Sequence, residues 1–286
     1  MTSGARQAPG TAGCSVSAAM ARSGLVPVDA QVLLAHVLGV DRAWLVGHAT
    51  DELARASADA FFALAKRCRD GEPVAYLTGR REFYGLDLAV TPAVLVPRPE
   101  TETLVEVVLE RLPAERPTRV ADLGTGSGAI ALAIASHRPL AEVMATDVSE
   151  ASLDVARGNA SRLRLANVTF AAGDWYDALP DGSPAFDAIA ANPPYVAEDD
   201  PHLRRGGLPH EPQRALTPGG DGLDALRTIV AGAGRWLASG GWLAVEHGHD
   251  QSEAVRALFE QAGFETIAVR RDLAGIPRVV AGRRIR

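Results

Sequence analysis

The strongest constraint on the fold of this chain is a repeated alternation of short apolar strands with helical segments, which begins at residue 119. Parallel strands of one sheet need a crossover of a dozen or more residues between them, and that crossover is usually a helix. The alternation therefore predicts an α/β fold with a parallel, doubly wound sheet. The expected strands are 119–123, 142–147, 168–172, 186–191 and 241–246, with a closing pair at 264–270 and 278–282. The helices expected among them are 129–136, one from residue 151, 223–237 and 252–262.

The first hundred residues follow a different pattern. Residues 1–13 are small and polar and predict a flexible tail. Residues 14–72 predict a small helical domain, because apolar residues recur there at helical spacing. Its expected helices are 28–38, 41–46 and 57–68, the last with Ser57 as its cap.

Residues 73–97 have strand-like composition and predict a β-hairpin that links the two domains. Its expected strands are 82–90 and 93–96, split by Thr91 and Pro92. The main domain is then 98–286, and it opens with a helix over 103–112. Proline and glutamate at 97–100 suit the start of that helix. Arg98 and Glu100 are therefore expected either to start the helix or to line the mouth of a ligand site.

Composition excludes several classes of protein. The chain has 286 residues, of which 47% are hydrophobic and 22% charged, so it can bury a core and is not disorder-like. A formal charge of −6 argues against a dedicated nucleic-acid binder. The two cysteines, Cys14 and Cys68, form no CxxC pair, and no cluster of metal-ligating residues is apparent, so we expect free thiols and no metal site. Without a signal sequence or an apolar run long enough to span a bilayer, a soluble cytoplasmic protein is expected.

A glycine-rich turn follows the first strand of the main domain. It reads Gly124, Thr125, Gly126, Ser127 and Gly128, and an acidic residue precedes it. Ligands bind beyond the carboxyl ends of strands in such sheets, and glycine lets the backbone approach them closely. The spacing differs from the GxGxxG of dinucleotide sites, and no lysine or arginine in the turn would neutralise a phosphate. By itself the turn is also compatible with a tight strand-to-helix connection.

The next two strand ends carry residues suited to adenosine. Asp147 ends the second strand, where its carboxylate could accept both ribose hydroxyls or could cap the next helix, a role that Ser149 could equally fill. Asp174 and Trp175 follow the third strand; the indole could pack on an adenine, and Asp174 could accept from its amine. Together with the glycine turn, these residues predict an adenosine pocket without a phosphate site.

The fourth strand ends in Asn192-Pro193-Pro194-Tyr195. Prolines stiffen the backbone, so the Asn192 side-chain oxygen and the Pro193 carbonyl could accept both protons of one NH₂ group. Tyr195 would add a flat face against a planar substrate. Such a clamp suits transfer of a methyl group to an amide or aromatic amine, whose lone pair is delocalised and must be oriented. Asn192, Pro193 and Tyr195 are therefore the expected catalytic residues, and all four residues are expected to bind substrate.

These motifs resemble the class I S-adenosylmethionine-dependent methyltransferases, and more closely the protein-(glutamine-N5) methyltransferases of the PrmC/HemK type. The resemblance implies a Rossmann-like, seven-stranded methyltransferase sheet and methylation of the glutamine in the Gly-Gly-Gln motif of class I peptide chain release factors. It also implies that 124–128, Asp147, Trp175 and Asn192 contact S-adenosylmethionine, and that the helical domain and hairpin help to dock the release factor. The matching segments are 71–79, 82–85, 96–102, 122–133, 186–195, 211–212, 222–223, 246–248 and 275–278.

Two other functions fit parts of the sequence. The Asn-Pro-Pro-Tyr motif is shared with adenine N6-methyltransferases of DNA, but the acidic balance of the chain disfavours nucleic acid as a substrate. A non-catalytic adenosine-binding protein would have no use for two convergent acceptors. Glu246 and His247 end the fifth strand and could suggest an acid–base pair, yet a held amide needs little base before transfer, so we expect a structural role. We also expect a monomer with no membrane contact.

Overall fold

The computed structural model describes residues 13–180, 182–183 and 185–285. The predicted flexible tail therefore lies outside the described residues, except for its last residue. The chain divides into two compact units, Met1–Thr78 and Gly79–Arg286. The boundary between them falls inside the segment that the sequence suggests as a linker.

The first unit is a helical bundle. Its helices are α1 Val16–Arg22, α2 Pro27–Leu38, α3 Arg42–Gly47, α4 Arg55–Arg69 and α5 Val74–Thr78. They enclose a small core that includes Leu33, Leu34 and Phe61, each with no more than 1% of its surface exposed. The expected helices are present, but α1 was not predicted, and Ser57 does not cap α4. That helix begins two residues earlier, after Ala54, which makes no capping side-chain bond. Both cysteines are free thiols within this unit.

The predicted hairpin exists, but its strands are not those expected. Strands β1 Arg80–Phe83 and β2 Leu86–Ala89 pair antiparallel, and the turn lies at Tyr84 and Gly85. Both turn residues have positive φ, 50° and 77°, as a two-residue turn that matches the twist of the strands requires. The predicted turn at residues 91–92 was wrong, and residues 93–96 are not a strand; the start of the predicted linker is helix α5.

The second unit is built on a seven-stranded sheet, as predicted. Its strands are β3 Thr118–Leu123, β4 Ala141–Asp147, β5 Val168–Ala172, β6 Phe186–Ala191, β7 Leu237–Glu246, β8 Glu265–Arg271 and β9 Pro277–Arg283. Their spatial order is β5-β4-β3-β6-β7-β9-β8. The sheet is mixed rather than wholly parallel, because β9 runs antiparallel to both of its neighbours. The chain order reverses between β3 and β6, where a doubly wound sheet opens a crevice for ligands.

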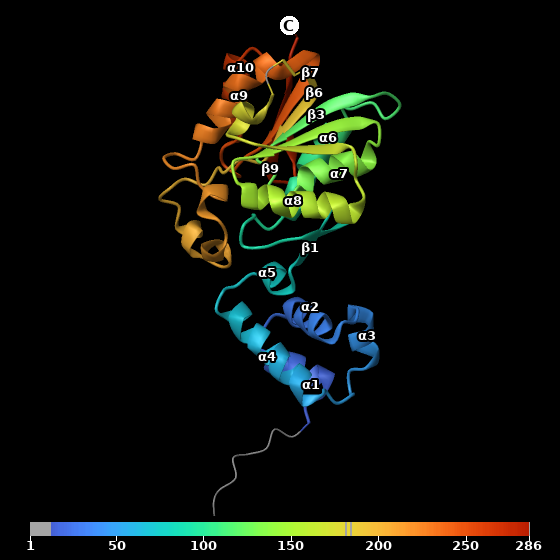
Figure 1. Cartoon of the computed structure of the whole chain (residues 1–286). Helices are drawn as coiled ribbons and strands as arrows, with labels where there is room; N and C mark the ends of the chain where they lie inside the picture. The colour runs from blue at the N-terminus through green and yellow to red at the C-terminus, as the bar shows by residue number, and fades with distance from the viewer. Residues whose placement is uncertain (1–12, 181, 184, 286) are drawn as a thin grey trace, which may run out of the picture. The chain divides into compact units, whose positions relative to one another are not determined.

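Helices cover both faces of this sheet (Figure 1). The α-helices of the unit are α6 Glu102–Leu109, α7 Ala129–His137, α8 Glu150–Leu163, α9 Asp224–Trp236 and α10 Ser252–Gln261. Short 3-10 turns are η1 Pro99–Thr101, η2 Trp175–Ala178, η3 Pro201–Arg204, η4 Leu208–His210 and η5 Gln213–Ala215. Apolar residues of α6, α7 and α8 form the core on one face, and those of α9 and α10 form the core on the other. Among the described residues, no helix combines the length and apolar character needed to cross a bilayer.

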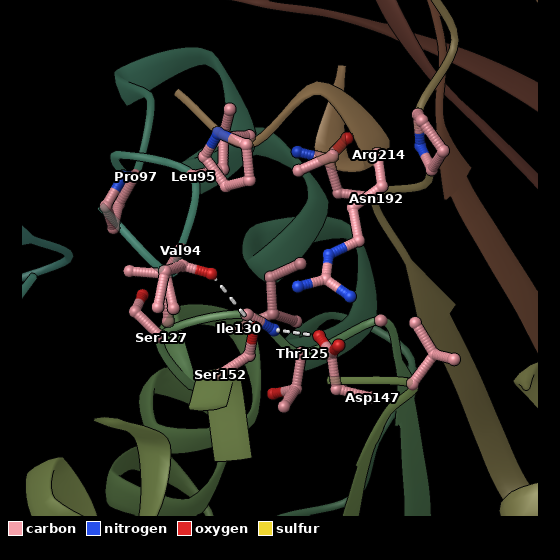
Figure 2. A pocket seen from close by; sticks show the side chains of 18 of the residues that line it. Val94, Leu95, Pro97, Thr125, Ser127, Ile130, Asp147, Ser152, Asn192 and Arg214 are labelled. Carbon is pink, nitrogen blue, oxygen red and sulfur yellow. Dashed lines mark hydrogen bonds between the residues drawn. The ribbon is translucent and has the colours of Figure 1, made fainter. Parts of the chain in front are cut away.

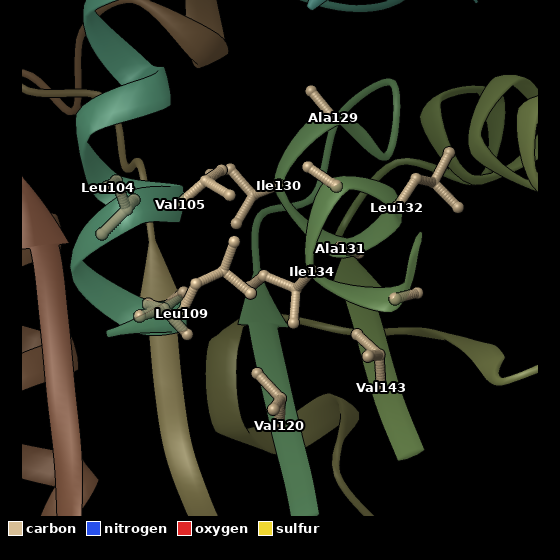
Figure 3. Packing of buried hydrophobic residues seen from close by; sticks show 14 of the residues in the cluster. Leu104, Val105, Leu109, Val120, Ala129, Ile130, Ala131, Leu132, Ile134 and Val143 are labelled. Carbon is tan, nitrogen blue, oxygen red and sulfur yellow. The ribbon is translucent and has the colours of Figure 1, made fainter. Parts of the chain in front are cut away.

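Helix α7 lies at the centre of the first core. Figure 3 shows Ile130 of α7 beside Val105 of α6, and Ile134 of α7 above the sheet residue Val120. Every residue of α7 from Ala129 to Ala135 is buried, so this helix is apolar all round and fixes the position of the glycine turn that precedes it.

A buried asparagine connects the hairpin to this core. The side chain of Asn159, on α8, accepts from the backbone N–H of Ala89 at 2.7 Å and donates to the carbonyl of the same residue at 3.0 Å. It also donates to the carbonyl of Ser127 at 2.9 Å. One side chain thus provides hydrogen-bond partners for backbone groups at the end of β2 and in the glycine turn.

We predict that Asn159→Ala lowers the free energy of unfolding by about 2–3 kcal/mol, because it leaves buried backbone groups without partners. The neighbouring Gly158→Ala is the matched control. Its position is an exposed helix interior with open space around the added methyl group, so it should raise stability by about 0.5–1 kcal/mol. Urea titrations followed by circular dichroism measure both; equal stabilities for the two variants would contradict the anchoring role.

Candidate active site

A pocket opens at the carboxyl ends of β3, β4, β5 and β6. Its empty volume, mouth included, is about 990 Å³. The lining comes from segments far apart in the chain, and Figure 2 shows Thr125, Asp147, Asn192 and Arg214 around the same space. The lining residues are drawn from 93–98, Thr101, 124–130, 147–152, 173–175, 192–194 and 212–215.

The glycine turn that the sequence singled out forms one wall of the pocket. Gly124 has φ 74°, and a methyl group added there would lie 3.2 Å from the Trp175 ring. Gly128 caps α7 with φ 85°, where an added methyl group would meet Leu132 at 3.0 Å. The backbone of the turn can therefore approach the indole and the helix only because it carries no side chains at these positions.

Asp122, the acidic residue before the glycine turn, holds the turn in place through hydrogen bonds. Asp122 is fully buried; its Oδ2 accepts from the Thr125 hydroxyl at 2.6 Å and from the Ala131 backbone N–H at 3.1 Å. Burial raises the pKa of this carboxyl to about 7, while those two hydrogen bonds oppose the rise. Asp122 thus connects the turn to the first turn of α7.

Asp147 lies where the sequence placed it, at the end of β4 on the pocket wall. Its Oδ2 accepts from the backbone N–H of Gly126 at 2.9 Å, and its Oδ1 accepts from that of Ser149 at 2.8 Å. The helix-cap alternative is wrong, because Ser149 itself caps α8 by accepting from Ser152. A carboxylate has about four lone-pair sites, so two remain for a ligand.

The third strand end also contributes as expected. Asp174 and Trp175 both line the pocket. Trp175 is half-buried with φ 44°, an uncommon conformation for a bulky residue, and its ring lies against Gly124. The N–H of Gly173 donates to the Asp147 carbonyl at 3.1 Å, which joins this strand end to the previous one.

Only part of the Asn-Pro-Pro-Tyr segment faces the pocket. Asn192 and Pro194 line the pocket, whereas Pro193 and Tyr195 are not among its lining residues. The Asn192 side-chain nitrogen donates to the Thr101 hydroxyl at 3.1 Å, which leaves its side-chain oxygen available. The Tyr195 hydroxyl donates to Glu246 at 3.1 Å, and burial raises the pKa of this phenol.

Gln251, which the sequence did not single out, and Gly222, which belongs to a segment matching the family, both contact the backbone of this segment. The side-chain nitrogen of Gln251 donates to the Tyr195 carbonyl at 2.8 Å, and its oxygen accepts from the Gly248 N–H at 2.8 Å. Gly222 lies directly against the same carbonyl: a methyl group added there would stand 2.4 Å from it. Nothing in the local pattern marks Gln251, because it lies 56 residues from Tyr195 in the chain.

An ion pair between a buried glutamate and a half-exposed arginine connects two other segments beside the pocket. Glu211 is 4% exposed and accepts from both the Val96 backbone N–H, at 3.0 Å, and the Arg98 guanidinium. Arg98 also precedes η1, where its side chain makes no capping hydrogen bond, and it lines the pocket. Glu100 is exposed at the start of η1 and is not a lining residue.

Glu246 and His247 are both fully buried at the end of β7. Burial raises the pKa of Glu246 to about 7 and lowers that of His247. His247 lies 2.7 Å from the Gly248 carbonyl through Nδ1, away from the pocket lining. Among the described residues, no group of three or more histidine, cysteine, aspartate or glutamate side chains is arranged to hold a metal ion.

Comparison with known proteins identifies the family. Residues 17–79 match the family model of the PrmC N-terminal domain, and residues 100–223 match that of the methyltransferase small domain. The release factor glutamine methyltransferase of Xylella fastidiosa is 54% identical to this chain, over 90% of this chain and 92% of its own length. The chain belongs to the release factor glutamine methyltransferase family.

Other comparisons agree. The release factor glutamine methyltransferase of Escherichia coli is 44% identical over 89% of this chain and 91% of its own length. A methyltransferase from Pyrococcus furiosus shares the fold, with a TM-score of 0.54 and 17% identity over 78% of this chain and 98% of that one. The resemblance of the sequence motifs to the PrmC/HemK-type protein-(glutamine-N5) methyltransferases is therefore confirmed.

We predict that Gly222→Ala lowers kcat by about 100-fold, because the added methyl group displaces the Tyr195 carbonyl and with it the segment beside the pocket. Its affinity for S-adenosylmethionine should change little, since the glycine turn is untouched. Gly219→Ala is the matched control. Gly219 also has a positive φ, 87° against 81° for Gly222, but nothing lies within 4 Å of the methyl group added there. Methylation kinetics and calorimetry compare the two variants. Equally low kcat values would show that strain at the positive φ, and not the contact with the Tyr195 carbonyl, causes the loss of activity.

Proposed function

We propose that this methyltransferase transfers the methyl group of S-adenosylmethionine to the side-chain amide nitrogen of the Gly-Gly-Gln glutamine in class I release factors. The observation that carries this proposal is the orientation of Asn192. Its nitrogen is held by Thr101, so its oxygen is the free atom at the edge of the pocket. An acceptor at that position suits an NH₂ group, which offers two donors.

The residues around the glycine turn suit the adenosine of the cofactor. We infer that Asp147 accepts from the ribose hydroxyls, and that Asp174 and Trp175 contact the adenine. Their support is their common place in the pocket lining, beside 124–127. Among the described residues, the arginines that line the pocket are Arg98 and Arg214, and both lie outside the turn, as expected for a ligand that carries no phosphate.

The cofactor, when bound, supplies a methyl group on a positively charged sulfur. The chain must orient the amide nitrogen of the substrate, whose lone pair is delocalised into the carbonyl. We infer that the Asn192 side-chain oxygen and the Pro193 carbonyl accept its two protons and direct the nitrogen at the methyl carbon. The new N–C bond then forms as the C–S bond breaks, and the nitrogen afterwards loses one proton to water. Positioning and charge complementarity provide the acceleration.

Recognition of the protein substrate involves more of the chain. We infer that the first unit, whose residues 17–79 match the PrmC N-terminal domain, docks the release factor together with the hairpin. A release-factor substrate also implies action in the cytoplasm.

The proposed function is tested by supplying S-adenosylmethionine with a labelled methyl group to three acceptors. They are a class I release factor from the same source, the same factor with the Gly-Gly-Gln glutamine changed to alanine, and adenine-containing DNA. We expect label in the first alone. Label in the alanine variant would place the modification elsewhere, and label only in DNA would support an adenine methyltransferase instead.

Two variants separate the clamp from the cofactor site. We predict that Asn192→Ala lowers kcat by about 100- to 1,000-fold, as does loss of other groups that orient a reacting atom, with a smaller effect on S-adenosylmethionine binding. Asp147→Ala should mainly weaken cofactor binding, by about 10- to 100-fold, because it removes charge-assisted hydrogen bonds. Calorimetric titration together with methylation kinetics distinguishes them; near-normal turnover of Asn192→Ala would remove the clamp from the mechanism.

A further inference from the structure

The two arginines of the pocket lining, Arg98 and Arg214, differ in their partners. The Arg98 guanidinium is paired with Glu211, whose side chain is buried. Arg214 lies on η5 and is exposed, and its side chain makes no ion pair or hydrogen bond with the residues that the structure describes. Figure 2 shows the Arg214 side chain turned into the pocket. Its positive charge is therefore available to a ligand there.

The backbone on both sides of Arg214 is anchored. Three residues before it, the buried carboxylate of Glu211 accepts from the Val96 backbone N–H at 3.0 Å. Two residues after it, the carbonyl of the buried Leu216 accepts from the Val196 backbone N–H at 3.0 Å. The short turn between these anchors keeps Arg214 at the pocket, while its long side chain can still adjust to what is bound.

The charges of S-adenosylmethionine limit what a guanidinium can contact. The molecule carries a positive sulfonium, a positive ammonium group and a single negative group, the carboxylate of its methionine part. A guanidinium repels the first two and binds a carboxylate through two parallel N–H···O bonds. With the adenosine assigned to Asp147, Asp174 and Trp175, the methionine part is left to contact other residues of the lining, to which Arg214 belongs.

We propose that Arg214 binds the carboxylate of the methionine part of S-adenosylmethionine. This inference rests on the proposed function, which places the cofactor in this pocket. It explains why a pocket for a ligand without phosphate has an arginine that the protein leaves without an acidic partner. It also connects η5 to the cofactor, so that a segment 19 residues beyond Tyr195 helps to form the binding site.

Arg214→Met and Arg205→Met form a matched pair of variants. Arg205 is an exposed arginine between η3 and η4, and it is not among the residues that line the pocket. Methionine keeps much of the length of arginine but removes its charge and its donors. We expect Arg214→Met to raise the Kd of S-adenosylmethionine by about 10- to 100-fold, because a charge-assisted contact is lost. Arg205→Met should leave this Kd unchanged.

Decarboxylated S-adenosylmethionine isolates the group that Arg214 contacts. It keeps the adenosine, the sulfonium and the amine but lacks the carboxylate. In calorimetric titrations we expect the wild type and Arg214→Met to bind it with nearly the same Kd. An unchanged Kd of S-adenosylmethionine in Arg214→Met would overturn the proposal. So would an equal loss of affinity for both ligands, because the contact would then involve another part of the cofactor.

Methylation assays separate this inference from the proposed function. The titrations contain no methyl acceptor, so a wild type that binds S-adenosylmethionine but leaves release factor unlabelled contradicts only the proposed function. Arg214→Met could instead bind the cofactor as tightly as the wild type and methylate release factor with a lower kcat. Arg214 would then act on the methyl acceptor, and the inference would be wrong while the proposed function stands.

Discussion

The pairing of β3 with β4 on one side and with β6 on the other is the constraint on which the site depends. These parallel ladders align the ends of the strands, so that Leu123 lies opposite Thr146 and Ala191. The chain leaves the sheet at each of these ends, and each exit carries polar residues toward one crevice. Further hydrogen bonds then join the exits, from Gly126 to Asp147 and from Gly173 to the same residue. The pocket therefore depends first on the order of the strands, which brings the separate motifs together.

The rigidity of the site has a cost that is visible in two buried acids. Asp122 and Glu246 end strands of the same sheet, both are fully buried, and burial raises the pKa of each to about 7. Each retains one oxygen without a partner among the described residues. Apolar residues would be less costly at such positions. Asp122 holds the glycine turn through Thr125, and Glu246 holds Tyr195 at the end of the Asn-Pro-Pro-Tyr segment, so the two acids order different parts of the site.

The N-terminal unit and the sheet unit solve different physical problems. The helices of the first unit bury a compact core of their own, centred on Leu33 and Phe61. The second unit buries two cores, one on each face of the sheet, and several of its buried polar residues, such as Asp122 and Glu246, lie at strand ends. This division matches the two family models, which cover residues 17–79 and 100–223 separately. Membership of the release factor glutamine methyltransferases thus rests on both units, although the pocket described here belongs to the second.

The sequence by itself determined the elements whose signals are local. The sequence located all seven strands of the sheet. For most of them the signal is a short apolar run, as a strand buried in the sheet requires, whereas β8 is an exposed edge strand. The glycine turn, Asp147, Asp174-Trp175 and Asn192 were recognisable because each lies at the end of such a strand or just after it. The family was recognisable for the same reason, since its motifs are short and contiguous.

Only the tertiary structure decided which residues support the site. Thr101 lies 91 residues from Asn192, and Glu246 lies 51 residues from Tyr195, so no local pattern connects them. The hairpin turn, by contrast, is a local feature that the sequence analysis placed wrongly, because Tyr84 and Gly85 take the positive φ of the turn. The orientation of the Asn192 amide depends on which atoms surround it, and a sequence specifies those neighbours only through the fold.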